Sequence, residues 1–131
     1  MNRPILSHDD AQRISAAASA FAEAKGWPVS IAILDHAGHL LMFQRLDGAN
    51  LGSVDTSIAK ARTALLFDRP TKALEDAIAG GRIVLASLPQ ATPIQGGLPI
   101  RDEGALIGSV GVSGVLSPQD EEIAQAGIDA L

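Results

Sequence analysis

Residues 29–48 read V-S-I-A-I-L-D-H-A-G-H-L-L-M-F-Q-R-L-D-G and contain two apolar runs, 29–34 and 39–46, on either side of the turn 35–38. Side chains alternate between the two faces of a strand, so each run presents two distinct faces. An Asp that opens the turn and a Gly that supplies positive φ suit a short hairpin with a bulge. The stretch therefore predicts an antiparallel β-hairpin.

The residues before this hairpin predict a helix that starts just after Ser7 and ends near Gly26. Ser7 is a favourable N-cap, and Asp9 and Asp10 place negative charge in the first turn, where the helix dipole favours it. Apolar residues at helical spacing predict the buried face of this helix, namely Ile14, Ala18 and Phe21.

Two further helices are predicted after the hairpin. The first can be capped by Ser53 or Asp55 and ends before Arg69-Pro70. Its predicted buried face consists of Ile58, Ala61 and Leu65. A shorter helix opens at Thr71 and closes at Gly80-Gly81, since glycine is common at the C-terminal end of helices.

The last third of the chain predicts a second hairpin and a final helix. Residues 83–88 fit either a strand or a helical turn, and the prolines that follow interrupt regular structure. Residues 93–100 are typical of a loop that enters a strand, and 105–115 are an apolar strand after the turn 102–104. The pair Ser117-Pro118, as N-cap and first helical residue, predicts the start of the last helix.

The predicted order is helix, hairpin, helix, short helix, hairpin, helix, in a single domain over residues 1–131. Tight hairpins give an antiparallel sheet, and helices at both ends of the chain can cover its faces. The predicted fold class is therefore α+β, a profilin- or PAS-like antiparallel β-sheet flanked by helices. Glycines 108, 111 and 114 lie within a strand, so they are not a dinucleotide-binding fingerprint, which connects a strand to a helix.

Composition argues against several classes of function. The net charge is -5 and the 10 basic residues are scattered, which argues against nucleic acid as a partner. The absence of cysteine excludes disulfides, thiolate metal sites and thiol catalysis. No apolar run is long enough to span a membrane, and the first residues lack the apolar segment of a signal peptide. We therefore expect a cytoplasmic protein without a membrane partner.

Five segments form a pattern that extends, in order, over nearly the whole chain. They are the hairpin 29–48, Lys60-Ala61 with Arg69-Pro70-Thr71, Q-G-G-L-P-I at 95–100, I-G-S-V-G-V-S-G at 107–114, and Gln119-Asp120-Glu121 with Ala126-Gly127. In these segments the chain resembles the GlcG/HbpS family of small haem-binding proteins. It is also similar to the C-terminal domain of the PduO-type cobalamin adenosyltransferases.

The resemblance implies a profilin-like α/β domain that assembles into dimers or larger homo-oligomers. Some relatives bind haem, one of them as an extracellular redox sensor, and others belong to catabolic operons without an agreed activity. By resemblance, we therefore expect a small-ligand-binding protein with haem as the candidate cofactor. Its role would be accessory or sensing, in catabolism or in a redox response. A family fixes a fold more firmly than a function.

Three histidines are candidate iron ligands, because imidazole is the usual axial ligand of haem. His36 and His39 flank the hairpin turn, where a histidine is also common as a simple polar turn residue. His8 lies in the first turn of the first helix, and the resemblance adds it because one branch of the family has a haem ligand in the N-terminal helical region. The imidazoles of His36 and His39 lack an obvious third partner for zinc.

Arg45, Asp47 and Lys60 are candidate ligand-binding residues. Arg45 and Asp47 are two residues apart, so we expect them to share a strand face. They form either a surface ion pair or the mouth of a pocket, where the guanidinium binds a carboxylate or a haem propionate. Lys60 has small neighbours on its helix and either extends to solvent or points its ammonium at an anion in a pocket.

The loop Gln95-Gly96-Gly97 and Ser113 complete the candidate ligand-binding residues. The loop offers backbone amides and little side-chain bulk, so it either cradles an anionic group or forms a tight turn. Ser113 lies near the end of a strand, where the predicted helix start at Gln119-Asp120 can approach it.

These residues are compatible with more than one class of function. The leading prediction is a homo-oligomeric protein that binds a small anionic molecule, with haem preferred by resemblance. The alternative is an enzyme that catalyses proton transfer, of the tautomerase or isomerase kind, on an anionic carboxylate substrate. Asp47 and Lys60 are its candidate catalytic residues, and Arg45 would help to stabilise an enolate. A purely structural oligomer is a third interpretation.

Overall fold

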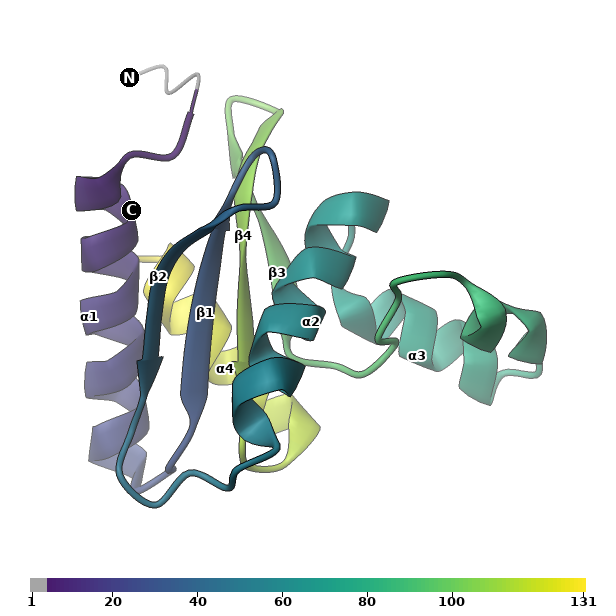
Figure 1. The fold of residues 1–131 in the computed structure, drawn as a ribbon, viewed down its shortest axis with the longest axis horizontal. Coiled ribbons are helices and arrows are strands. Elements are labelled where there is room, and N and C mark those ends of the chain that lie inside the picture. The colour runs from purple at the N-terminus through teal and green to yellow at the C-terminus, as the bar shows by residue number, and fades with distance from the viewer. Residues whose placement is uncertain (1–4) are drawn as a thin grey trace.

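A computed structural model describes residues 5–131, which fold into helices on both sides of one β-sheet (Figure 1). The elements in chain order are α1 (His8–Lys25), β1 (Ser30–Asp35), β2 (Leu40–Arg45), α2 (Ser53–Phe67), α3 (Thr71–Ala79), the 3₁₀-helix η1 (Ile83–Ser87), β3 (Gly97–Asp102), β4 (Ala105–Ser113) and α4 (Ser117–Ile128). This order confirms the predicted succession of helices and hairpins. None of the described helices is both long and apolar enough to cross a membrane.

The four strands pair in the antiparallel order β2-β1-β4-β3. The β1–β2 hairpin has its register shift between Ile33 and Leu34, which is the predicted bulge. Its turn is closed by a hydrogen bond from the Gly38 N–H to the Asp35 carbonyl at 3.0 Å, and Gly38 has a φ of 87°. The turn residues therefore form the hairpin that their sequence predicts.

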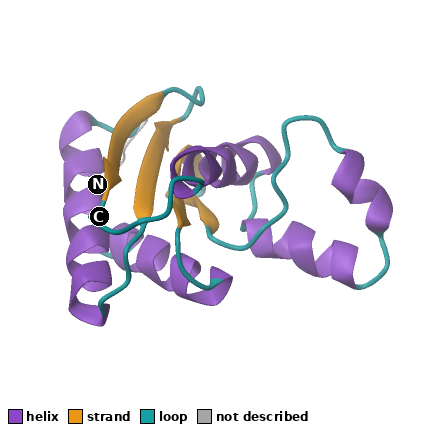
Figure 2. Ribbon diagram, turned by 60° about the horizontal axis from the view of Figure 1, so that its bottom comes forward, coloured by secondary structure: helices purple, strands orange, loops and turns teal. Residues whose placement is uncertain are grey.

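The sheet separates two layers of helices, which confirms the α+β class (Figures 1 and 2). Helices α1 and α4 pack on one face, where β1 contributes Ile31 and Ile33 to the main core. Helix α2 packs on the other face, where Ala32 and Leu34 meet Ala61. The alternation within residues 29–34 therefore supplies both cores, and it makes β1 buried on both faces.

Helix α1 begins as predicted. The Asp10 N–H donates to Ser7 Oγ at 3.1 Å and the Ser7 N–H donates to Asp10 Oδ2 at 3.2 Å, so the two residues form a reciprocal capping box. The predicted face is correct at Ile14 and Ala18, whereas Phe21 is only half-buried.

Two predicted N-caps are wrong by one residue. Ser53 is the first residue of α2, and neither it nor Asp55 caps the helix. The Ser53 hydroxyl instead donates to the Asn50 carbonyl at 2.6 Å and lies 2.8 Å from Ser30 Oγ, so it joins the helix to β1. Ser117 is likewise the first residue of α4.

Residues 71–94 form an arm that projects from the body of the domain (Figures 1 and 2). It contains α3 and η1, so the ambiguous segment 83–88 is largely a helical turn. The base of the arm is fixed by the buried residues Thr71 and Leu74, whereas η1 has no buried residue. The arm is therefore anchored at its base and exposed along its end.

Candidate functional site

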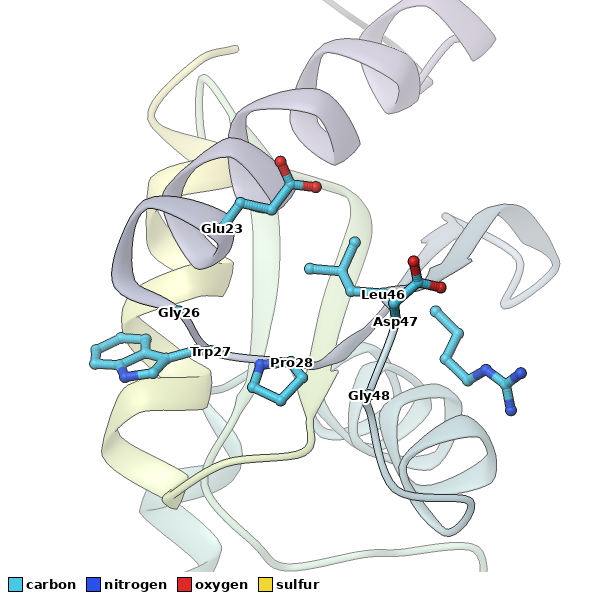
Figure 3. A pocket seen from close by; sticks show the side chains of 8 residues that line it. Glu23, Gly26, Trp27, Pro28, Leu46, Asp47 and Gly48 are labelled. Carbon is cyan, nitrogen blue, oxygen red and sulfur yellow. The ribbon is translucent and has the colours of Figure 1, made fainter.

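A cavity of about 600 Å³ lies at the end of the β1–β2 hairpin that is opposite to the turn (Figure 3). Two segments line it: the end of α1 with its connection to β1 (Glu23, Gly26, Trp27 and Pro28), and the end of β2 with the following turn (Arg45, Leu46, Asp47 and Gly48). Strand pairing brings these segments together, because Ser30 of β1 is the register partner of Arg45.

The local backbone keeps the two segments of the cavity close. Helix α1 stops at Gly26, whose φ of 72° is left-handed, and the chain turns toward β1. The Leu46 N–H donates to the Val29 carbonyl at 2.9 Å. Gly48 has a φ of 88°, and a Cβ at this position would lie 3.5 Å from Pro28 Cβ. That distance is an ordinary van der Waals contact, so it is the left-handed φ of this turn, beside Pro28, that favours glycine.

Arg45 and Asp47 both line this cavity, but they do not share a strand face. Strand β2 ends at Arg45, and Asp47 lies in the turn that follows, so the expectation of a shared face is wrong. Within the described residues, the two side chains form no ion pair with each other. Both are exposed to solvent at the opening of the cavity.

Lys60 is not a solvent-exposed lysine, which corrects that interpretation of it, and it does not line this cavity. Its ammonium lies 3.0 Å from Asp120 Oδ2 and donates to the Val112 carbonyl at 3.0 Å. The side chains of Lys60 and Asp120 are each only 2% exposed. Lys60 therefore joins α2 to the end of β4 and the start of α4 as half of a buried ion pair.

The Asp120 carboxylate binds the backbone just before α4 as well as the Lys60 ammonium. Its second oxygen accepts a hydrogen bond from the Val115 N–H at 3.2 Å. Burial raises the pKa of the Asp120 carboxyl, and this effect exceeds the opposite influence of the Lys60 ammonium. Helix α4 thus returns to the end of β4, where Ser113 is half-buried and pairs in register with Ser30.

The loop Gln95-Gly96-Gly97 packs around Lys60 and has two of its amides already bonded. The Gln95 N–H donates to Glu75 Oε1 at 3.0 Å, and the Gly97 N–H donates to Thr71 Oγ1 at 2.9 Å. A Cβ at Gly96 would lie 2.8 Å from the Lys60 ammonium nitrogen. The loop therefore packs against α2 and α3, and its Gln95 and Gly97 amides already have partners within the chain.

The turn of the β1–β2 hairpin holds His36 and His39, both exposed. The carboxylate of Asp35 accepts hydrogen bonds from the Ala37 N–H at 2.9 Å and the His39 N–H at 3.0 Å. Partial burial raises the pKa of the Asp35 carboxyl. The two N–H groups and the neighbouring imidazoles have the opposite and larger effect, so they hold this pKa below its ordinary value. The other carboxylate oxygen lies 3.8 Å from His39 Nδ1.

The candidate residues do not form one site. The six-residue strands of the hairpin separate the histidine turn from the cavity by about 20 Å. His8 is the exposed first residue of α1. The predicted proton-transfer site would need Lys60 beside Arg45 and Asp47. The Lys60 ammonium instead binds Asp120 and the Val112 carbonyl, so the three residues do not meet.

Sequence reasoning missed two features of these sites. Glu23 and Trp27 line the cavity, and the only signal for Trp27 was its being the single tryptophan, next to Pro28. Asp120 was predicted only to lie in the family pattern at the start of the last helix, near Ser113, and no pattern in the sequence indicates that it pairs with Lys60.

Comparisons with known proteins agree with this fold. The family model described as "Haem degrading protein HbpS-like" matches residues 6–129. The protein GlcG of Escherichia coli K12 is 41% identical over 109 residues, which cover 83% of this chain and 81% of GlcG.

Two solved structures are similar over nearly the whole chain. A crystal structure of a double mutant of Streptomyces reticuli HbpS superposes with a TM-score of 0.90 at 32% identity and covers 100% of this chain and 90% of that one. The crystal structure of a PduOC:haem complex has a TM-score of 0.88 at 30% identity, with 97% of this chain and 95% of that one covered. The resemblance predicted from the sequence is thereby confirmed.

Proposed function

The chain belongs to the HbpS-like family of haem-degrading proteins, and from this premise we propose that it binds haem at the turn of the β1–β2 hairpin. The similarity to a domain crystallised with haem, at a TM-score of 0.88, carries the proposal. Its role would be accessory or sensing, in catabolism or in a redox response. The cytoplasmic location stays a prediction.

The turn has the donor chemistry that haem iron requires, and we assign the iron ligand to His39. Its side chain is 81% exposed, and its Nδ1 faces the Asp35 carboxylate at 3.8 Å. Metal-binding histidines commonly direct one ring nitrogen at a carboxylate, which leaves the other nitrogen for the metal. Asp35 would thus orient the imidazole so that Nε2 is available to iron.

Apolar side chains beside the turn would contact the face of the porphyrin. Leu40, the residue after His39, is 50% exposed, and Leu66 on α2 is 53% exposed. The end of α2 reaches the turn, because a Cβ at Gly38 would lie 3.6 Å from Leu65 Cδ2. Bound haem supplies a redox-active iron, and the residues of the chain bind and orient it. Arg45 lies too far from the turn to pair with a propionate of haem bound there.

A haem titration followed by absorbance tests this assignment. We expect a saturable one-to-one shift of the Soret band in the wild-type protein and its loss in His39→Ala, while His36→Ala and His8→Ala retain it. Asp35→Asn keeps an acceptor for the turn but removes the charge, and it should weaken haem binding about tenfold, as for other groups that orient a ligand. Binding that does not saturate, or that is unchanged in all three histidine variants, contradicts the proposal.

We further propose that the chain forms homo-oligomers through the arm. Ile83 is 73% exposed, Val84 64% and Ile94 41%, so three large apolar side chains of one projecting segment face solvent. Large exposed apolar patches mark interaction surfaces. A second copy of the chain is the occupant that the family resemblance suggests.

Light scattering after size exclusion tests the role of the arm. We expect the wild-type protein to elute as a dimer or larger oligomer and the variant with Ile83→Ser and Val84→Ser to elute as a monomer. The matched control replaces two exposed leucines outside the arm, Leu51 and Leu116, with Ser and should remain oligomeric. A monomeric wild-type protein, or an arm variant of unchanged mass, refutes this interface.

A further inference from the structure

We propose that the cavity at the end of β2 binds a small zwitterion, and that an apolar α-amino acid is the chemical class that fits its lining. The cavity is separated from the histidine turn by the length of the hairpin, about 20 Å. This ligand site is therefore independent of the proposed haem site.

The charged groups of the cavity have opposite signs and are not neutralised by each other. Glu23 and Asp47 supply two carboxylates and Arg45 supplies one guanidinium. Within the described residues, none of these three side chains has a hydrogen-bond or ion-pair partner. All three are therefore available to a ligand, and the lining has a net charge of one negative unit. A dianion such as the propionate pair of haem is disfavoured there.

The backbone adds to the negative character of one side of the cavity. Helix α1 ends at Gly26, which lines the cavity, and the C-terminal end of a helix carries partial negative charge. Lys25, the basic residue of the last turn, does not line the cavity; its ammonium lies 5.5 Å from the ring centre of Phe21 and 5.9 Å from that of Trp27. The α1 side of the cavity is therefore suited to the ammonium of a ligand.

The positions of the lining side chains complete the assignment (Figure 3). Glu23 points from the last turn of α1 toward Leu46, and Asp47 follows directly after Leu46. An ammonium can bind these carboxylates, and Arg45 also lines the cavity, so its guanidinium can bind the carboxylate of the ligand by a forked pair of hydrogen bonds. The apolar side chain of the ligand then contacts Leu46 and Pro28.

Fluorescence of Trp27 reports on this cavity directly, because the chain has 1 Trp and 0 Tyr and Trp27 lines the cavity. We would titrate haem-free protein with leucine, with isoamylamine, which lacks the carboxylate, and with isocaproate, which lacks the ammonium. Leucine should give a saturable change, isoamylamine a weaker one, and isocaproate none. The proposal is overturned if the leucine signal does not saturate or if isocaproate binds as tightly as leucine.

Two variants test the two ends of the ligand separately. Glu23→Gln should weaken leucine binding about fivefold, the effect of one exposed charge pair of about 1 kcal/mol. Arg45→Gln should weaken leucine binding similarly but strengthen isoamylamine binding, because it removes the one cation among the described residues that line the cavity. Glu122→Gln, an exposed acid on α4, is the control and should leave both unchanged. Unchanged leucine binding in both cavity variants, with melting curves that show folded protein, overturns the assignment.

The proposed haem site and the proposed amino-acid site can be tested separately. His39→Ala should bind leucine as the wild-type protein does, whatever its effect on haem. If leucine binding is lost together with haem binding in His39→Ala, the cavity is not a separate site and this inference is wrong.

Discussion

Lys60→Met is expected to lower the free energy of unfolding by about 3–5 kcal/mol, because it leaves a buried carboxylate without its ammonium. The Lys60 ammonium lies 3.0 Å from Asp120 Oδ2 and from the Val112 carbonyl oxygen, and both charged side chains are 2% exposed. Methionine fills a similar volume, so loss of charge rather than of packing dominates. Domains of this size are stable by only about 5–15 kcal/mol, and urea denaturation will register the loss.

The loss of stability in Lys60→Met should be smaller at acidic pH than at neutral pH. Burial raises the pKa of Asp120 above its ordinary value of 3.8, and Lys60→Met removes the ammonium that opposes this rise. A carboxyl with a raised pKa in the folded state favours folding below its unfolded pKa, and this contribution disappears as the pH rises through the folded pKa. The variant should therefore lose less stability in mildly acidic buffer than at neutral pH.

An exposed ion pair provides the matched control. Lys72 lies 2.6 Å from Asp76 on the surface of α3, with exposed fractions of 47% and 59%. Solvent screens this pair, so Lys72→Met should hardly change stability. Replacing both buried partners, as Lys60→Met with Asp120→Leu, should recover much of the loss, because no buried charge is left unpaired. Equal stability of Lys60→Met and Lys72→Met rules out the role given to the buried pair.

Gly111→Ala is expected to be the second large effect, at the upper end of the roughly 1–3 kcal/mol that overpacking a core costs, or beyond it. A Cβ at Gly111 would lie 2.0 Å from the Ser57 carbonyl oxygen and 2.5 Å from the Ala61 nitrogen. Both are backbone atoms of α2, so rotation of a side chain cannot relieve the contact. The helix or the strand has to move.

The packing of α2 on the sheet depends on a row of small residues. Ala32, Gly111 and Gly97 are register partners across β1, β4 and β3, beneath the helix. A Cβ at Gly97 would lie 2.3 Å from the Lys60 carbonyl oxygen. The same close approach that forbids a methyl group at Gly111 therefore brings Lys60 within reach of the end of β4 and of Asp120.

A second glycine separates crowding from the general effect of adding a methyl group. Gly52 has a φ of -66°, and a Cβ there would meet its nearest atom, an oxygen of Asn50, at 3.5 Å. Gly52→Ala should therefore change the melting temperature little, whereas Gly111→Ala should lower it by many degrees. If the two variants melt together, the close contact between α2 and β4 is not as tight as described.

The sequence determined the elements of the fold and their order, because the signals for them are local. The cap at Ser7, the Asp35–Gly38 turn and the start of α4 near Ser117 each depend on residues within a few positions. The alternation of residues 29–34 likewise requires only the geometry of one strand. Where local signals compete, as for the serines at the starts of α2 and α4, the prediction is wrong by one residue.

Only the tertiary structure decided which candidate residues meet. Lys60 and Asp120 are far apart in sequence, and they pair because glycines on β3 and β4 let α2 lie against the sheet. The cavity exists because hairpin pairing brings 23–28 beside 45–48, so that Arg45 lines it together with Glu23 and Asp47. The physical reason is the same in both cases. Local periodicity fixes the direction in which a side chain leaves its own element, whereas its partner is fixed by how closely separate elements pack.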